Sequence, residues 1–142
     1  MLNLSFCITE CKFGWSVALK IKHLMGSAGN DNAFSPAVRA GNFLFVSGQA
    51  SVDETGKIIE DSFEGEMRRS LENIKRILAM EGLTLENVVQ VRSYISAQEY
   101  LGDYDRVYRE YFHNPRPART TLLGVLGTVV KYEVDVVAYA ET

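Results

Sequence analysis

The chain has 142 residues, the usual size of one domain, and it can bury a core without a metal ion or a disulfide. Apolar residues make up 46% of it and charged residues 23%, which is typical of a globular protein and argues against a disordered one. The formal net charge of −3 disfavours nucleic acid as a partner, because binding a phosphate backbone needs clustered Lys and Arg.

The start of the chain carries its only two cysteines, Cys7 and Cys11. Their C-x-x-x-C spacing has no second pair, and neither histidine stands at ligand spacing, so we expect ordinary thiols and no metal site. This cysteine usage fits the reducing cytoplasm. Glu10 and Lys12 interrupt the apolar residues, so neither a signal peptide nor a membrane anchor is expected.

The first predicted elements are strands. Alternating apolar and polar residues predict a strand over 17–25, and a run of turn-forming residues predicts a loop over 26–32. An extended segment is expected over 34–39. Gly41-Asn42 is a favoured two-residue hairpin turn, so the chain is predicted to return as a strand over 43–46.

The clearest element is a helix that begins after Ser62 and ends at Gly82. Ser62 can cap the first turn, two glutamates there favour the helix dipole, and Gly82 suits a C-terminal cap. Six apolar residues recur at three- and four-residue steps and predict one buried face: Phe63, Met67, Leu71, Ile74, Ile77 and Leu78.

The rest of the chain predicts a strand over 88–96, a second amphipathic helix over 99–112 that prolines stop, and strands over 120–125 and 130–140. The element order is therefore β, β-hairpin, α, β, α, β, β. This order predicts an α+β fold, a two-layer domain in which two helices cover one face of a mixed sheet of about six strands.

The last strand also predicts association between copies of the chain. Alternate residues from Tyr132 to Ala138 are apolar and fill one face of the strand. The large side chains of Val137 and Tyr139 lie on the other face. Two helices leave that second face without cover. Apolar surface on both faces without a third layer implies that subunits associate.

The chemistry must come from carboxylates, arginine and hydroxyls, because no nucleophile elbow, phosphate loop or zinc motif is present. Arg119 opens a strand beside a rigid proline segment and can bind a carboxylate through two hydrogen bonds. Glu133 and Asp135 project from one face of the last strand. They either form a salt bridge with Arg119 or act as acid and base, and spacing alone leaves both interpretations open.

Five motifs in consistent order then carry a resemblance to a known family. They are Ala37-Val38-Arg39-Ala40-Gly41-Asn42, Val46-Ser47-Gly48-Gln49, Thr55-Gly56-Lys57-Ile58, Leu71-Glu72-Asn73-Ile74 and Pro117-Ala118-Arg119-Thr120-Thr121. Together they resemble the RidA/YjgF family from about Phe34 to the C-terminus, and the Ser-Gly-Gln and Pro-Ala-Arg motifs are the most specific. The resemblance implies one RidA-like domain over 16–142, with residues 1–15 as an N-terminal extension outside it.

The resemblance implies a chorismate-mutase-like fold, a homotrimer with ligand clefts between subunits, and no cofactor. Members of the family hydrolyse 2-aminoacrylate and related enamines or imines to 2-oxo acids and ammonia. The expected function is therefore hydrolytic deamination of a small carboxylate derived from a 2-imino or 2-amino acid. One alternative is a protein on the same fold that binds a small carboxylate without turnover. The other is RNA cleavage or translation inhibition, which the acidic composition disfavours.

The resemblance also implies the site residues. Arg119 is the expected carboxylate-binding residue, and Glu133 the residue that holds or deprotonates the attacking water. The expected substrate-binding residues are Phe34, Ser47, Gly48, Tyr104, Asp105 and Thr121. Three of these differ from common residues of the family: Phe34 replaces a tyrosine, Asp105 an asparagine and Thr121 a cysteine.

Overall fold

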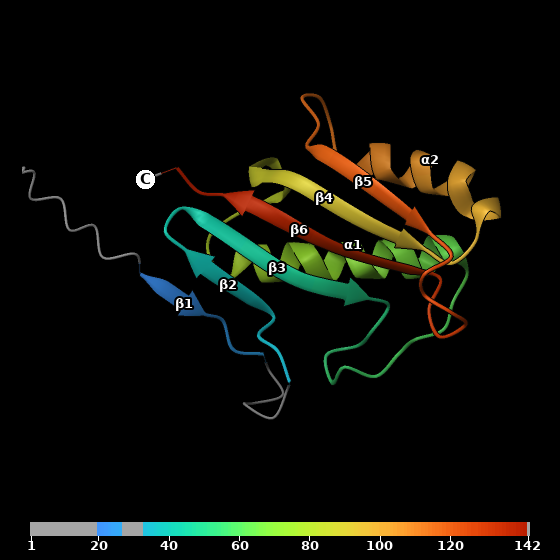
Figure 1. The fold of residues 1–142 in the computed structure, drawn as a ribbon, viewed down its shortest axis with the longest axis horizontal. Coiled ribbons are helices and arrows are strands. Elements are labelled where there is room, and N and C mark those ends of the chain that lie inside the picture. Colours follow the sequence, from blue (N-terminus) through green and yellow to red (C-terminus); the bar gives the residue numbers. More distant parts are fainter. Residues whose placement is uncertain (1–19, 27–32, 142) are drawn as a thin grey trace, which may run out of the picture.

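The computed structural model describes residues 20–26 and 33–141. The elements in chain order are β1 (Ile21–His23), β2 (Ala37–Ala40), β3 (Phe43–Ala50), α1 (Phe63–Ala79), β4 (Val88–Ile95), α2 (Leu101–Tyr111), β5 (Ala118–Leu123) and β6 (Tyr132–Tyr139) (Figure 1). Short 3-10 helices, Leu85–Asn87 and Gln98–Tyr100, precede β4 and α2. The predicted extension over 1–15, the first part of the strand predicted over 17–25 and most of the loop predicted over 26–32 lie outside the described residues.

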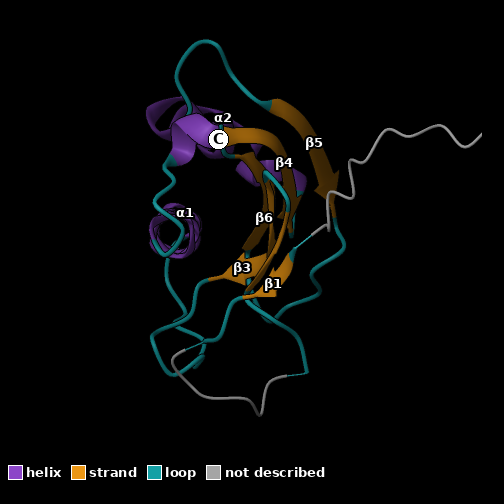
Figure 2. Ribbon diagram, turned by 90° about the vertical axis from the view of Figure 1, so that its left-hand side faces the viewer, coloured by secondary structure: helices purple, strands orange, loops and turns teal. Residues whose placement is uncertain are grey.

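The six strands form one sheet in the order β1-β2-β3-β6-β4-β5. All neighbours are antiparallel except β4 and β5, which run parallel and are joined by a crossover through α2. β6 lies between β3 and β4, so the last strand of the chain holds the two halves of the sheet together. Figure 2 shows both helices on the same side of the sheet, which confirms the predicted two-layer α+β fold.

The predicted hairpin and helix ends are confirmed. Gly41 and Asn42 connect β2 to β3, with Gly41 at φ 59°. Ser62 begins α1 by accepting a hydrogen bond from the Gly65 amide at 3.1 Å. At the other end Gly82 has φ 70°, and its amide donates to the carbonyl of Ala79 at 3.1 Å. Glycine suits this left-handed turn because it has no Cβ.

The core lies between the helices and the sheet. The six apolar residues predicted along α1 are all buried, as are Tyr132, Val134, Val136 and Ala138 of β6. Each large apolar side chain removed from water stabilises the fold by roughly 1.5–3 kcal/mol. No helix in the described part of the chain is both long and apolar enough to cross a membrane.

No helix or strand in the described part of the chain covers the face of the sheet opposite the helices, and this face carries an aromatic patch (Figure 2). Phe43, Phe45 and Tyr139 are 44%, 48% and 37% exposed, and the ring of Phe43 packs edge-on against Tyr139 with centroids 5.2 Å apart. Phe45 pairs with Val137 across β3 and β6. We call Phe43, Phe45, Val137 and Tyr139 the open-face patch; it lies where the sequence predicts apolar residues without intrachain cover.

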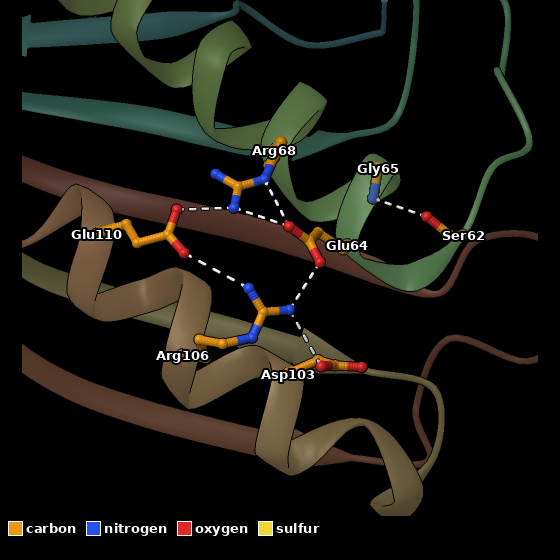
Figure 3. Close-up of polar contacts among 7 residues, drawn as sticks. All are labelled: Ser62, Glu64, Gly65, Arg68, Asp103, Arg106 and Glu110. Atoms are coloured by element: carbon orange, nitrogen blue, oxygen red, sulfur yellow. Dashed lines mark hydrogen bonds and ion pairs between the residues drawn. The ribbon is translucent and has the colours of Figure 1, made fainter.

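Ion pairs on the outer surface join α2 to α1 (Figure 3). Arg106 donates to Glu64 at 2.6 Å and to Asp103 at 3.1 Å, while Arg68 donates to Glu64 at 2.8 Å and to Glu110 at 2.7 Å. Hydrogen bonds from Arg106 and then Arg68 lower the pKa of Glu64 to about 2. Such exposed pairs are individually weak. As a network they orient α2, and α2 carries part of the candidate site.

Candidate functional site

Arg119 lies on the helix-facing side of the sheet, against α2. Its partner in β4 is Val91, which is fully buried beneath the helices. The Arg119 Cζ atom lies 4.9 Å from the ring centroid of Tyr104 and 4.7 Å from that of Tyr108. Its Nη1 donates to Asp105 Oδ1 at 2.9 Å. Two cation–π contacts and one ion pair therefore fix the direction of a guanidinium whose side chain is 35% exposed.

Thr121 follows two residues later and faces the same way, because side chains alternate along a strand. Its Oγ1 lies 3.0 Å from the hydroxyl of Tyr104. The structure thus brings together four of the predicted site residues, Arg119, Asp105, Tyr104 and Thr121, which we call the Arg119 cluster. Burial tends to lower the pKa of Arg119, but the hydrogen bond to Asp105 and the negative charge of that carboxylate outweigh burial and raise the pKa.

Glu133 lies on the opposite side of the sheet. It pairs with Tyr94 of β4, whereas its neighbour Val134 points into the core. Burial, followed by the charge of Asp135, raises the pKa of Glu133. Its carboxylate makes no hydrogen bond or ion pair within the described residues. It is therefore a carboxylate that is free to act on a ligand and whose pKa is shifted toward neutrality.

Neither Glu133 nor Asp135 pairs with Arg119. The predicted alternative, a salt bridge between Arg119 and one of these carboxylates, is therefore wrong. Asp135 accepts hydrogen bonds from Arg92 Nε and from the Tyr94 hydroxyl, both at 2.8 Å. Arg119 pairs with Asp105 instead. The reason is the register of β5 on β4, which turns Arg119 toward the helices, while Glu133 and Asp135 face away from them.

Gly48 of β3 lies beside Glu133, and two other predicted residues, Ser47 and Phe34, are linked to it through the chain and through Ser35. The pairing of β3 with β6 shifts register between Val46 and Gln49, as in a β-bulge. Gly48 then lies so near Glu133 that a Cβ on it would overlap Glu133 Oε1. Ser47 donates its hydroxyl to the carbonyl of Ser35 at 2.6 Å, and Phe34, which precedes Ser35, is 61% exposed. We call Phe34, Ser47, Gly48 and Glu133 the Glu133 group.

The predicted site residues thus fall into two groups on opposite faces of one sheet. Within a single chain Arg119 and Glu133 do not converge. Tyr108, whose ring lies under Arg119, is not among the predicted site residues; its spacing of four residues from Tyr104 in a predicted helix was the available signal. Burial raises the pKa of Tyr108 to about 12, so its hydroxyl stays protonated.

Comparison with known proteins identifies the family. Residues 26–141 match the family model described as endoribonuclease L-PSP. A RutC family protein of Pyrococcus horikoshii is 37% identical over 110 residues, which cover 76% of this chain and 87% of that protein. The crystal structure of Mmf1 from yeast matches with a TM-score of 0.72 and 27% identity, covering 87% of this chain and 97% of the other.

The fold is shared with a protein that carries the predicted family name. The crystal structure of RidA from the Antarctic bacterium Psychrobacter matches with a TM-score of 0.74 at 24% identity, covering 83% of this chain and 98% of that one. The predicted chorismate-mutase-like architecture is therefore the fold of Rid proteins. From the match over residues 26–141 and the five ordered motifs it follows that the chain belongs to the endoribonuclease L-PSP family, the family of the RidA/YjgF proteins.

Proposed function

We propose that the chain hydrolyses small enamines and imines that carry a carboxylate, and that two neighbouring copies in a homotrimer form each site. The observation that carries this proposal is the position of Arg119 and Glu133 on opposite faces of the same sheet. A carboxylate-binding group and an unpaired carboxylate complement each other chemically, but one chain cannot bring them to one ligand.

The uncovered face supports the same arrangement. The open-face patch exposes aromatic surface next to the Glu133 group, and such a patch favours association. A head-to-tail contact that closes after three copies would place the Arg119 cluster of one copy against the Glu133 group of the next. Each trimer would then contain three equivalent sites.

Arg119 would hold the substrate carboxylate. Its Nη1 is taken by Asp105, and the remaining donors of the guanidinium fork are available to a ligand. The aromatic rings beneath the guanidinium keep it from turning away. Fixing the carboxylate in this way positions the reactive carbon, which converts a loose encounter into a productive one.

Glu133 would handle the proton of the attacking water. A proton from solvent first converts the enamine to an iminium ion. Water then adds to the iminium carbon: a C–O bond forms, the C=N π electrons move to nitrogen, and Glu133 accepts a proton from the water. Glu133 next returns this proton to the nitrogen, and the C–N bond breaks as the C=O bond forms. The hydroxyl proton leaves with ammonia as ammonium, so atoms and charge balance.

The raised pKa of Glu133 suits this role, because a carboxylate with a pKa nearer neutrality both accepts a proton and gives it back. Imines of this kind also hydrolyse unaided, so a modest lowering of the barrier is enough. From the cysteine usage we also propose that the protein acts in the cytoplasm.

A second candidate function is binding of a small carboxylate without turnover. The observation that favours it is the ion pair between Arg119 and Asp105, since Asp105 competes with a substrate carboxylate for the same guanidinium. Turnover separates the two functions. Imines generated in situ from amino acids by an oxidase, and 2-aminoacrylate generated from serine by a dehydratase, should lose ammonia faster with the purified protein than without it.

Mixing two inactive variants tests the shared site. Arg119→Ala and Glu133→Gln should each be inactive alone. When the two are unfolded together in equal amounts and refolded, a closed ring of three should contain some sites with Arg119 from one variant and Glu133 from the other. Random mixing restores about a quarter of the wild-type activity if three copies assemble in a ring. No recovery, with mixed oligomers demonstrated by mass spectrometry, would show that the site does not span two copies.

A further inference from the structure

A cavity of about 440 Å³ lies beside Arg119, between the second half of α2 and the start of β5. Six residues line it: Asp105, Tyr108, Arg109, Arg116, Pro117 and Arg119. Three guanidinium groups thus meet one carboxylate, although the chain as a whole carries a net charge of −3. The cavity is a local concentration of positive charge on an acidic protein.

Two of these arginines keep their charge uncompensated. Arg116 donates from Nε to the carbonyl of Phe112 at 3.1 Å and from Nη1 to Asn114 Oδ1 at 2.7 Å, and both of these partners are neutral. Arg109 makes no hydrogen bond or ion pair within the described residues. Every other arginine in the described ranges lies within 4.0 Å of a carboxylate oxygen. The two without such a partner line the same cavity.

This arrangement is suited to an anion. Arg116 is held by two hydrogen bonds, so little side-chain freedom is lost when it binds a ligand. Guanidinium groups bind carboxylates and phosphates through paired, charge-assisted hydrogen bonds. Two unpaired guanidinium groups that line one concave space therefore bind an anionic group more strongly than either would alone.

The size of the cavity points to a ligand larger than 2-aminoacrylate. Its volume lies in the range of ordinary small-molecule sites. A three-carbon substrate anchored at Arg119 through its one carboxylate would leave both unpaired arginines without a partner. A substrate with a further acidic group at its far end would reach them.

We propose that Arg109 and Arg116 form a second anion subsite, so that the preferred substrates are imines carrying a second acidic group, a carboxylate or a phosphate, in addition to the carboxylate held by Arg119. This inference rests on the proposed function, because it names the substrate class of that site. Dicarboxylic imines are the simplest members of the class.

Binding of unreactive probes tests the subsite without turnover. Calorimetry should show that glutarate, with two carboxylates, binds the wild-type protein about tenfold more tightly than butyrate, which has one. Arg109→Gln and Arg116→Gln should each remove most of this preference while leaving butyrate binding unchanged. Arg109→Gln breaks no hydrogen bond or ion pair within the described residues, so it keeps the fold. Arg76→Gln, which changes a paired arginine on α1 outside the cavity, is the matched control and should preserve the preference.

Equal affinity for glutarate and butyrate, or a preference that survives both substitutions, would overturn the inference. The source of the anion follows from a third probe: 3-phosphoglycerate should bind more tightly than glutarate if the subsite prefers phosphate, and less tightly if it prefers carboxylate.

The proposed function is tested separately by turnover. If no imine is hydrolysed but the glutarate preference depends on Arg109 and Arg116, hydrolysis fails and the anion subsite stands. If monocarboxylic and dicarboxylic imines are hydrolysed equally well, hydrolysis stands and the subsite fails.

Discussion

Arg119→Ala should abolish recognition of a carboxylate substrate and leave the fold intact. The substitution removes one partly exposed ion pair, worth about 0–1 kcal/mol, and two cation–π contacts of about 0.5–1 kcal/mol each. The carboxylate it leaves unpaired, Asp105, is half exposed and stays hydrated. We therefore expect a loss of about 1–3 kcal/mol, or a fall in Tm of roughly 4–12 °C for a domain of this size.

The effect on catalysis should be much larger. A charge-assisted hydrogen bond is worth about 1.5–3 kcal/mol, and a guanidinium fork makes two of them to one carboxylate. At about 1.4 kcal/mol for each tenfold change, kcat/KM should fall by at least about two orders of magnitude. Arg119→Lys should rescue little, because lysine keeps the charge and loses the planar fork.

The assay measures Tm and imine hydrolysis on the same preparation of each variant. Arg39→Ala is the matched control: it removes another ion-paired arginine, on β2 and outside both the Arg119 cluster and the Glu133 group. It should lower Tm and leave kcat/KM unchanged. An Arg119→Ala protein that keeps its activity while its Tm collapses would refute the assignment and show that Arg119 serves the fold alone.

Four further outcomes are expected. Asp105→Asn should lower KM for a carboxylate substrate several-fold in steady-state kinetics, because it removes the competing charge; a higher KM would show that Asp105 orients Arg119 instead. The raised pKa of Glu133 means that the native state binds more protons than the unfolded state, so stability falls as pH rises from the ordinary glutamate pKa through the raised one. Glu133→Gln should therefore raise the urea midpoint at pH 8 and have little effect at pH 4, and a lower midpoint at pH 8 would reveal a cation facing Glu133. Tyr108→Phe should raise the free energy of unfolding by about 1 kcal/mol in urea titrations, because its buried hydroxyl has no partner in the described part of the chain; a loss of stability would reveal one. Light scattering should give about three times the chain mass of 15.9 kDa and a smaller mass for Phe45→Asp in the open-face patch, whereas a monomeric wild-type protein would refute the association.

The sequence by itself determined the local elements. The Gly41-Asn42 turn, the Ser62 and Gly82 caps and the apolar stripe between them depend on residues a few positions apart, and all three appear as predicted. Alternation along β6 likewise identified the buried and the uncovered face. Ordered motifs identified the family, since they span most of the chain.

Only the tertiary structure decided how the candidate site is divided. Whether Arg119 meets Glu133 or Asp105 depends on the register of β5 on β4 and on the packing of α2 over that edge. The cavity between Arg109 and Arg116 depends on the same packing, because the two residues come from different elements. A shift of one residue in register would turn Arg119 to the other face, and register is set by burial of the whole core rather than by the residues beside Arg119.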